Sequence, residues 1–198
     1  MLKPKDMRFA PTFCSRMVCL AALLVQSCIS AQLDYVFDKA FTAQTAGQEA
    51  EAITLYRELL AQDPTSDGAW HNLGVVFLVR GDFVNAVEAF DRAIELNPRN
   101  LLGHYLLALS LLQAGQWSKA REEVRETRKL RESMIAQTVT RLGMPSYDGI
   151  DLRVIGSSFD DKLTKIERAS VGERYLSGYE ATELAFVARP VSRSGFQT

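Results

Sequence analysis

The segment from Trp70 to Pro98 constrains the fold more than any other part of this chain. It reads W-x2-L-G-x2-F and then A-x3-F, with Gly81 between the two halves. Apolar residues recur at intervals of three and four in 67–80 and again in 83–96, which predicts two short amphipathic helices. Gly81 favours a turn between these helices, and Pro98 ends the second one. The segment therefore predicts a helical hairpin.

Two small residues lie where the paired helices must approach closely. Gly74 belongs to the first helix and Ala86 to the second. A large side chain of one helix can pack against a small residue of the other, which fixes the register of the pair.

This pattern resembles the tetratricopeptide repeat (TPR), a helix-turn-helix unit of about 34 residues. One such unit cannot bury its own apolar face, so neighbouring repeats are expected. A shift upstream by one repeat length finds Gly47 at the turn and Pro64 at the end, but Val36, Lys39 and Ala40 replace Trp, Leu and Gly. Residues 33–66 are therefore a degenerate first repeat.

The same shift downstream finds a third repeat that keeps Gly115 and Ala120. His104 takes the position of the Trp, where we expect it to be a packed aromatic substitute. Glu132 takes the position of the Pro, so nothing ends the second helix there. We expect this helix to run from Trp117 to about Leu142.

The resemblance implies an all-α solenoid of about three TPR repeats, with an extended last helix and a partly ordered C-terminal tail. The expected segments are 1–31 as a signal segment, 33–66 as the degenerate first repeat, 67–100 as the second, 101–142 as the third with its capping helix, and 143–198 as a C-terminal segment of unknown role. Gly143 and Pro145 supply the end of the long helix.

The extended helix is rich in charge. Acids and bases alternate along it, which favours a solvated, salt-bridged face over a nucleic-acid contact. The residues concerned are Arg121, Glu122, Glu123, Arg125, Glu126, Arg128, Lys129, Arg131 and Glu132.

The segment 1–31 has the layout of a secretory signal peptide: basic residues, an apolar run over 17–25, and a small-residue end at Ser30-Ala31. Cleavage after Ala31 would leave Gln32 as the new terminus. Three alternatives stay open: lipidation at Cys28, an uncleaved membrane anchor over 17–25, and a chain that is not exported. Export predicts a periplasmic or secreted location, and the lipidated or anchored forms would be tethered to a membrane.

Cysteine and charge content agree with export. All three cysteines lie before Ala31, so a chain cleaved after that residue has none for a disulfide. Cleavage removes four of the 23 basic residues and one of the 24 acidic ones, which leaves 19 against 23 and a net charge of −4. This balance argues against nucleic acid as the partner.

The sequence does not predict an enzyme. The two histidines, His71 and His104, fall at positions that the repeat already explains, with His71 expected to be partly exposed. Zinc-hydrolase, nucleophile-elbow and glycine-rich phosphate-binding motifs do not occur. We therefore expect no catalytic residue, no metal site and no cofactor.

By the TPR resemblance, the first helices of the repeats line a concave groove. The resemblance places ten residues in it: Phe37, Phe41, His71, Asn72, Val75, Val79, Leu102, Tyr105, Leu106 and Leu109. The groove is largely apolar. TPR domains that grip the acidic C-terminal tails of heat-shock chaperones use Lys, Arg and Asn side chains, and only Asn72 matches that set. We expect no such clamp activity.

An apolar groove should be covered by a partner peptide or helix, by a second copy of the chain, or by the C-terminal tail. In that tail, the alternation from Ile150 to Ile155 predicts an extended segment, and Phe159, Leu163 and Ile166 predict a helix with Asp160 near a start capped by Ser157 or Ser158. Residues after Arg189 are expected to be loose.

These features predict an exported, non-catalytic adaptor that binds a peptide or helix of a partner protein. One alternative is a TPR scaffold that presents an effector segment in residues 146–198. Another is a homodimer formed through an exposed end of the first repeat, at Val36, Phe37, Ala40 and Phe41.

Overall fold

The computed structural model describes the backbone of residues 30–142, 146–147, 150–172, 174–177, 180 and 184. Side chains are described for 30–137, 159–172, 174–177, 180 and 184. The expectations for the signal segment before residue 30, for Gly143 and Pro145, and for the chain after Arg189 lie outside the described residues.

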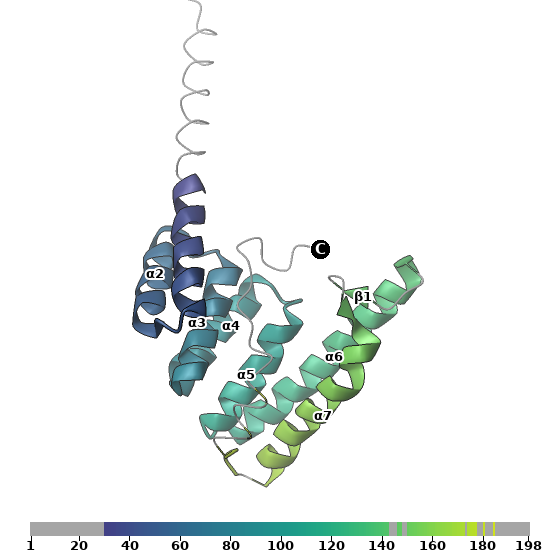
Figure 1. Cartoon of the computed structure of the whole chain (residues 1–198). Coiled ribbons are helices and arrows are strands. Elements are labelled where there is room, and N and C mark those ends of the chain that lie inside the picture. Colours follow the sequence, from purple (N-terminus) through teal and green to yellow (C-terminus); the bar gives the residue numbers. More distant parts are fainter. Residues whose placement is uncertain are drawn as a thin grey trace, which may run out of the picture.

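The described chain is an all-α solenoid in which each helix packs on the next (Figure 1). A first helix covers residues 30–45. It is followed by α2 (Glu49–Gln62), α3 (Asp67–Arg80), α4 (Phe83–Leu96), α5 (Leu101–Gln113), α6 (Trp117–Leu142), a small hairpin of β1 (Ser146–Tyr147) and β2 (Ile150–Asp151), and α7 (Leu152–Val171). The hairpin is antiparallel and pairs Ser146 with Asp151.

The helix pairs repeat at a constant interval, which three turn glycines mark. Gly47, Gly81 and Gly115 each turn the chain between two helices with φ of 74°, 80° and 75°. This left-handed backbone conformation suits glycine because it has no Cβ. At Gly81 the turn is closed by bonds from Gly81 N to Leu78 O (3.1 Å) and from Asp82 N to Phe77 O (2.9 Å).

The α3–α4 hairpin has the bounds that the sequence predicts. Its register depends on Gly74, because a Cβ added there would lie 2.8 Å from the ring of Phe90. Phe90 is fully buried, so its ring has no free space to move into. Asp82 caps α4 by accepting from the Asn85 backbone at 3.4 Å.

The long helix is also confirmed. Without a proline at Glu132, α6 continues from Trp117 to Leu142. The prediction that this helix caps the solenoid was wrong. Helix α7 packs along α6, so α6 is not the end of the array.

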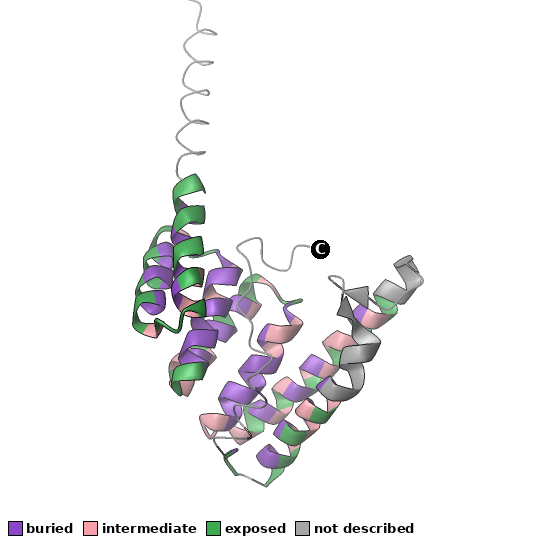
Figure 2. Cartoon of the chain, viewed as in Figure 1, coloured by how far each residue is buried: buried purple, intermediate pink, exposed green. Residues whose placement is uncertain are grey.

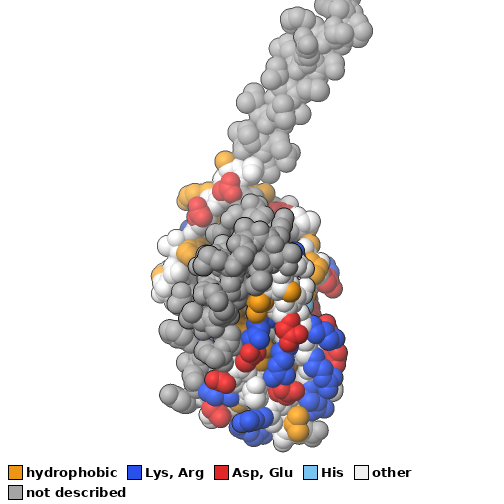
Figure 3. Space-filling model, turned by 90° about the vertical axis from the view of Figure 1, so that its right-hand side faces the viewer, with side chains coloured by type: hydrophobic (Ala, Val, Ile, Leu, Met, Phe, Trp, Pro, Cys, Tyr) orange, Lys and Arg blue, Asp and Glu red, His pale blue; other side chains and the backbone are white. Residues whose placement is uncertain are grey.

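The contact between α6 and α7 uses several of the charged residues expected to be solvated. Arg121 donates to the carbonyl of Ser170 at 2.7 Å, and Arg128 pairs with Glu167 at 2.7 Å. Arg131 pairs with Asp160 at 2.7 Å. The pairs Arg125–Glu122 and Lys129–Glu126 stay exposed on the outer side. Figure 3 shows the lower part of this side of the molecule, where Lys and Arg alternate with Asp and Glu.

The prediction for the start of α7 was wrong. The extended stretch stops at Asp151, and the backbone is helical from Leu152, so Ser157 and Ser158 lie inside the helix and do not cap it. The apolar side of α7 decides this outcome, because Phe159, Leu163 and Ile166 are buried at helical spacing.

The core is one continuous cluster that extends from Leu33 to Leu184 (Figure 2). The end of the first repeat does not expose the apolar side chains expected there: Val36, Phe37 and Ala40 are buried, and Phe41 is partly buried. They face α2 and α3 in the same core, since Phe37 packs edge-on against Tyr56 with ring centroids 6.0 Å apart.

Candidate binding surfaces

Most of the ten residues of the predicted groove are packed within the molecule. Phe41 and Leu102 are partly buried, and Val79 is 62% exposed. The buried ones are Phe37, His71, Asn72, Val75, Tyr105, Leu106 and Leu109. In this structure the first helices of the repeats therefore form a filled core with an accessible part near Val79.

His71 is fully buried, which corrects the expectation of a partly exposed side chain. Its Nδ1 lies 3.2 Å from Nδ2 of Asn100, and its ring packs edge-on against Phe90 at 5.7 Å. Asn100 also caps α5 by accepting from the Gly103 backbone at 2.8 Å. His71 thus links α3 to the start of the next repeat.

Asn72 belongs to a buried polar cluster between the first two repeats. The Tyr56 hydroxyl donates to Gln44 Oε1 at 2.7 Å. Burial raises the pKa of Tyr56, and its hydrogen bond with Asn72 opposes this in part. Asn72 is therefore occupied inside the protein and is not presented to solvent.

A small pocket remains open beside Val79. It has a volume of about 190 Å³ and lies between the turn at Gly47 and α3. Its lining residues are Gln44, Thr45, Gly47, Glu49, Val75, Val76 and Val79. This pocket is the accessible part of the predicted groove that the described residues form.

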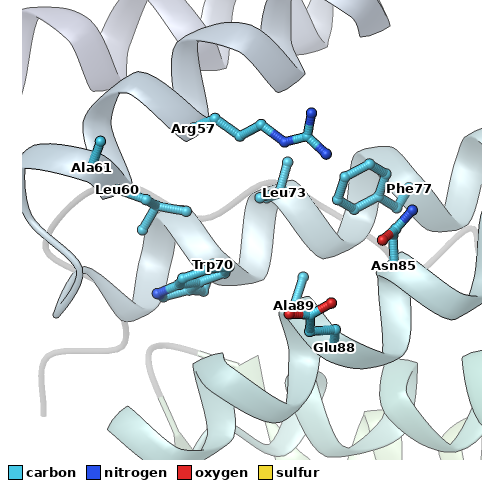
Figure 4. A pocket seen from close by; sticks show the side chains of 9 residues that line it. All are labelled: Arg57, Leu60, Ala61, Trp70, Leu73, Phe77, Asn85, Glu88 and Ala89. Carbon is cyan, nitrogen blue, oxygen red and sulfur yellow. The ribbon is translucent and has the colours of Figure 1, made fainter.

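A larger pocket of about 320 Å³ lies between α2, α3 and α4, on the other side of α3 (Figure 4). Trp70, Leu73 and Phe77 contribute its apolar wall, and Arg57 stands over the Phe77 ring at 5.7 Å. Figure 4 shows Glu88 and Asn85 on the α4 side. The sequence analysis missed this pocket, because it arises where the second helices of two adjacent repeats leave α3 uncovered.

The third repeat is covered by the C-terminal part of the same chain. The Tyr105 hydroxyl donates to the carbonyl of Leu184 at 2.9 Å, and its ring lies 5.1 Å from that of Phe159. The Gln113 side chain accepts from Leu176 N at 3.0 Å and donates to Leu176 O at 3.5 Å. Leu176 and Leu184 of the C-terminal segment thus lie against α5, and Leu184 contacts Tyr105, which the sequence assigned to the groove.

The sequence analysis gave this segment no specific structure. A local pattern in it was overlooked, because Ser177 and Glu180 have the S-x-x-E spacing of a capping box. Ser177 N donates to Glu180 Oε2 at 2.9 Å, and Glu180 N donates to Ser177 Oγ at 3.3 Å. These bonds to Ser177, and the charge of Arg174, lower the pKa of Glu180.

His104 is held by polar contacts more than by aromatic packing, which corrects the expectation for this position. Its Nδ1 lies 2.5 Å from Glu123 Oε1, and its Nε2 lies 3.1 Å from the carbonyl of Pro98. Partial burial opposes the charged imidazolium, but the Glu123 carboxylate and the Pro98 carbonyl outweigh it, so the pKa of His104 is raised.

The described residues contain no group of three or more His, Cys, Asp or Glu side chains placed to hold a metal ion. Within the same part of the chain, every helix is too short or too polar to cross a lipid bilayer.

Comparison with known proteins agrees with the repeat spacing. Residues 45–127 match the family described as anaphase-promoting complex, cyclosome, subunit 3 (ANAPC3). The fold is shared with the TPR2B-domain:pHsp70 complex of yeast Sti1, with a TM-score of 0.55 and 14% identity over 73% of this chain and 99% of the other. The chain has the fold of a TPR solenoid. A second TPR-like fold match, MamA, has a TM-score of 0.51 and 22% identity over 75% of this chain and 82% of the other.

The curated relatives are matched in part of their length. Superkiller complex protein 3 of Mus musculus is 29% identical over 90 residues, which are 46% of this TPR chain and 6% of the relative. Photosystem I assembly protein Ycf3 of Rippkaea orientalis is 35% identical over 89 residues, which are 43% of this chain and 50% of the relative. The similarity is thus one of repeats, and TPR arrays are scaffolds for protein binding, typically without catalytic activity.

Proposed function

We propose that this TPR protein is an exported, non-catalytic adaptor that binds a peptide or helix of a partner protein beside Val79, on the first two repeats. The open pocket next to Val79 carries the proposal. Of the ten residues predicted to line the groove, Val79 is the one with a largely exposed side chain, and its neighbours Val75 and Val76 give the pocket an apolar wall. A partner's apolar side chain can bury Val79 there.

The surroundings of the pocket limit what fits. Among the described residues that line it, Glu49 is the charged one, beside the polar side chains of Gln44 and Thr45. A volume of about 190 Å³ accommodates one or two aliphatic side chains and not a large cofactor. The partner is therefore a segment that presents a compact apolar residue, with polar or basic neighbours at the rim.

Export rests on the signal-like layout of the segment 1–31. The buried core supports cleavage after Ala31, because residues 30–32 are exposed and the first buried residue of the described chain is Leu33. Removal of everything before Gln32 leaves the described core whole.

The binding proposal is tested by placing a photo-crosslinking amino acid at position 79 of the full-length chain in its native cell. Val84 on α4 is the matched control, because it is also a valine, is 71% exposed and does not line the pocket. A specific adduct is expected from position 79 and not from 84. Val79→Asp should abolish the adduct formed from a probe at position 45, whereas Val84→Asp should leave it. Equal adducts from both positions, or equal loss with both substitutions, would refute the proposal.

A further inference from the structure

The pocket between α2, α3 and α4 has an apolar floor with one charged side chain on each side (Figure 4). Leu73 and Phe77 of α3 form the floor and are buried, and Trp70 lies at one end of it. Arg57 extends from α2 and Glu88 from α4, on opposite sides of the floor. A volume of about 320 Å³ is at the lower end for ligand pockets, so it takes one large side chain and not an extended cofactor.

Both charged side chains are available to a ligand. The Arg57 guanidinium lies 5.7 Å from the centroid of the Phe77 ring, and among the described residues it has no carboxylate partner. Glu88 is exposed and has no cationic partner in that same part of the chain. Arg92 of α4, in contrast, pairs with Glu95 at 2.6 Å. A cation and an anion across the floor are complementary to a ligand that carries an acid on one side and a base on the other.

The centre of the pocket offers apolar contact. Trp70 Nε1 donates to the carbonyl of Pro64 at 3.0 Å, so the one polar atom of this side chain is already bonded. The Asn85 amide donates to Asp82 Oδ2 at 2.6 Å. The rings of Trp70 and Phe77 remain as surfaces for packing, and aromatic rings pack well against further aromatic rings. The group that enters the pocket is therefore a large apolar side chain, best an aromatic one.

The next repeat fills the corresponding place with a side chain of its own. One repeat length further along the chain, Glu123 takes the position of Ala89, and His104 takes that of Trp70. The Glu123 carboxylate contacts the His104 ring, and this contact is partly buried. The pocket of the second repeat is open because Ala89 is too small to reach across it in the same way.

We propose that this pocket is a second protein-binding site. It takes a large apolar side chain from an extended segment of a partner protein, with an acidic residue of that segment against Arg57 and a basic one against Glu88. A free amino acid would make ion pairs only at exposed positions, where each contributes little, so the ligand is a peptide with further contacts to α2 and α4. The site lies on the other side of α3 from Val79 and does not rest on binding there.

The test uses the full-length chain and a synthetic peptide, Ser-Glu-Phe-Lys-Ser, with both ends blocked. The chain has two tryptophans, so the indole N–H signals in NMR report separately on the pocket, through Trp70, and on a remote position, through Trp117. The peptide should shift the Trp70 signal with a dissociation constant of about 1 mM or tighter and should leave the Trp117 signal unchanged. Replacing the peptide's Phe by Ala should remove the shift, and replacing its Glu by Lys should weaken binding severalfold.

Arg57→Glu should reverse this preference, so that the peptide with two lysines binds more tightly than Ser-Glu-Phe-Lys-Ser. Arg125→Glu is the matched control, since it makes the same change of charge on the exposed side of α6, away from the pocket. Ala89→Glu should abolish binding, because its side chain would fill the pocket as Glu123 does in the next repeat. Circular dichroism checks that this variant is folded. If it is not, Arg57→Glu decides, because Arg57 is exposed.

Absence of a Trp70 shift, equal shifts of Trp70 and Trp117, or an unchanged preference in Arg57→Glu would overturn the proposal. A Trp70 signal that moves on dilution without peptide would assign the pocket to a second copy of the chain and would overturn it as well. These readouts concern Trp70 and Arg57, whereas the cross-linking experiment probes Val79, so the failure of one proposal leaves the other standing.

Discussion

Trp70 and His104 occupy the same position in successive repeats, and their ring nitrogens make the same contact. Trp70 Nε1 donates to the carbonyl of Pro64 at 3.0 Å, and His104 Nε2 is 3.1 Å from the carbonyl of Pro98. A carbonyl only accepts, so His104 carries a proton on Nε2. His104 thus makes the same hydrogen bond to a proline carbonyl as Trp70 does. Its second ring nitrogen, Nδ1, contacts the carboxylate of Glu123.

This contact makes stability depend on pH. The pKa of His104 is raised in the folded chain, so the folded state binds its proton more tightly than the unfolded state does. The resulting stabilisation is complete below the ordinary histidine pKa of about 6.5 and is lost as pH rises through the higher folded value. The free energy of unfolding in urea should therefore fall as pH rises from about 6.5 through the higher pKa of the folded state.

Glu123→Gln should lower the pKa of His104, which is measured by NMR of the imidazole protons, and should flatten the pH dependence. His104→Trp should remove that dependence while restoring the repeat's usual aromatic ring. An unchanged titration of His104 in Glu123→Gln would contradict the assigned role of the carboxylate, whose oxygen lies 2.5 Å from the ring.

Gly74→Ala should destabilise the fold. An added methyl group would lie 2.8 Å from the buried ring of Phe90, and overpacking of this kind costs about 1–3 kcal/mol. The better helix propensity of alanine, about 1 kcal/mol, offsets part of the loss. Gly172→Ala is the control, since its nearest contact would be 3.5 Å and the expected change is within about 0.5 kcal/mol. Chemical denaturation followed by circular dichroism compares them, and equal stabilities would show that Gly74 does not set the register.

Phe159→Ala should cost about 3–5 kcal/mol, because Phe159 is buried against Tyr105 and a cavity would replace its ring. Val171→Ala on the same helix removes an exposed side chain and should change stability by about 0.5 kcal/mol or less. Differential scanning calorimetry measures both. A small effect of Phe159→Ala would mean that α7 is not an integral layer of the solenoid.

An acidic C-terminal chaperone peptide should not bind with a micromolar or tighter constant. Asn72, which matches the residues of such a clamp, is buried beside Tyr56, and the remaining clamp positions hold Phe37, Phe41, Leu102 and Leu106. Without cations at these positions, a carboxylate gains nothing on leaving water. Isothermal titration calorimetry tests this, and a micromolar constant would contradict it.

Intact mass of the protein from its native cell tests the N-terminal prediction. A chain that begins at Gln32 supports export and cleavage, and a lipid adduct on Cys28 would mean a membrane tether. A chain that keeps Met1 would contradict cleavage and would leave an anchor or an unexported protein.

The hairpin of α3 and α4 could be predicted from sequence because its determinants are local. Gly81 and Pro98 mark the helix ends, and Gly74 receives Phe90 within the same repeat. The length of α6 follows from the same logic, since Glu132 stands where a proline would end the helix.

The binding surfaces were harder to predict because they depend on residues far apart in the chain. The sequence around Arg121, Arg128 and Arg131 predicts a solvated face. In the structure these arginines contact α7, and no neighbouring residue in the sequence indicates that contact. Burial of Tyr105 likewise depends on Phe159 and Leu184. The helical periodicity of apolar residues assigns each residue to one face of its helix. It does not identify the element that covers that face.

The bond between Tyr105 and Leu184 joins residues 79 positions apart, in an array whose other contacts mostly link successive helices. Local hairpins close early in folding, and contacts of long sequence separation close late. On the ribosome, α5 and α6 will therefore emerge and pair with the inner face of α5 still bare. That face is sealed only after Leu184 has been synthesised, so a chain that stops short of it would have an exposed apolar stripe and a tendency to aggregate.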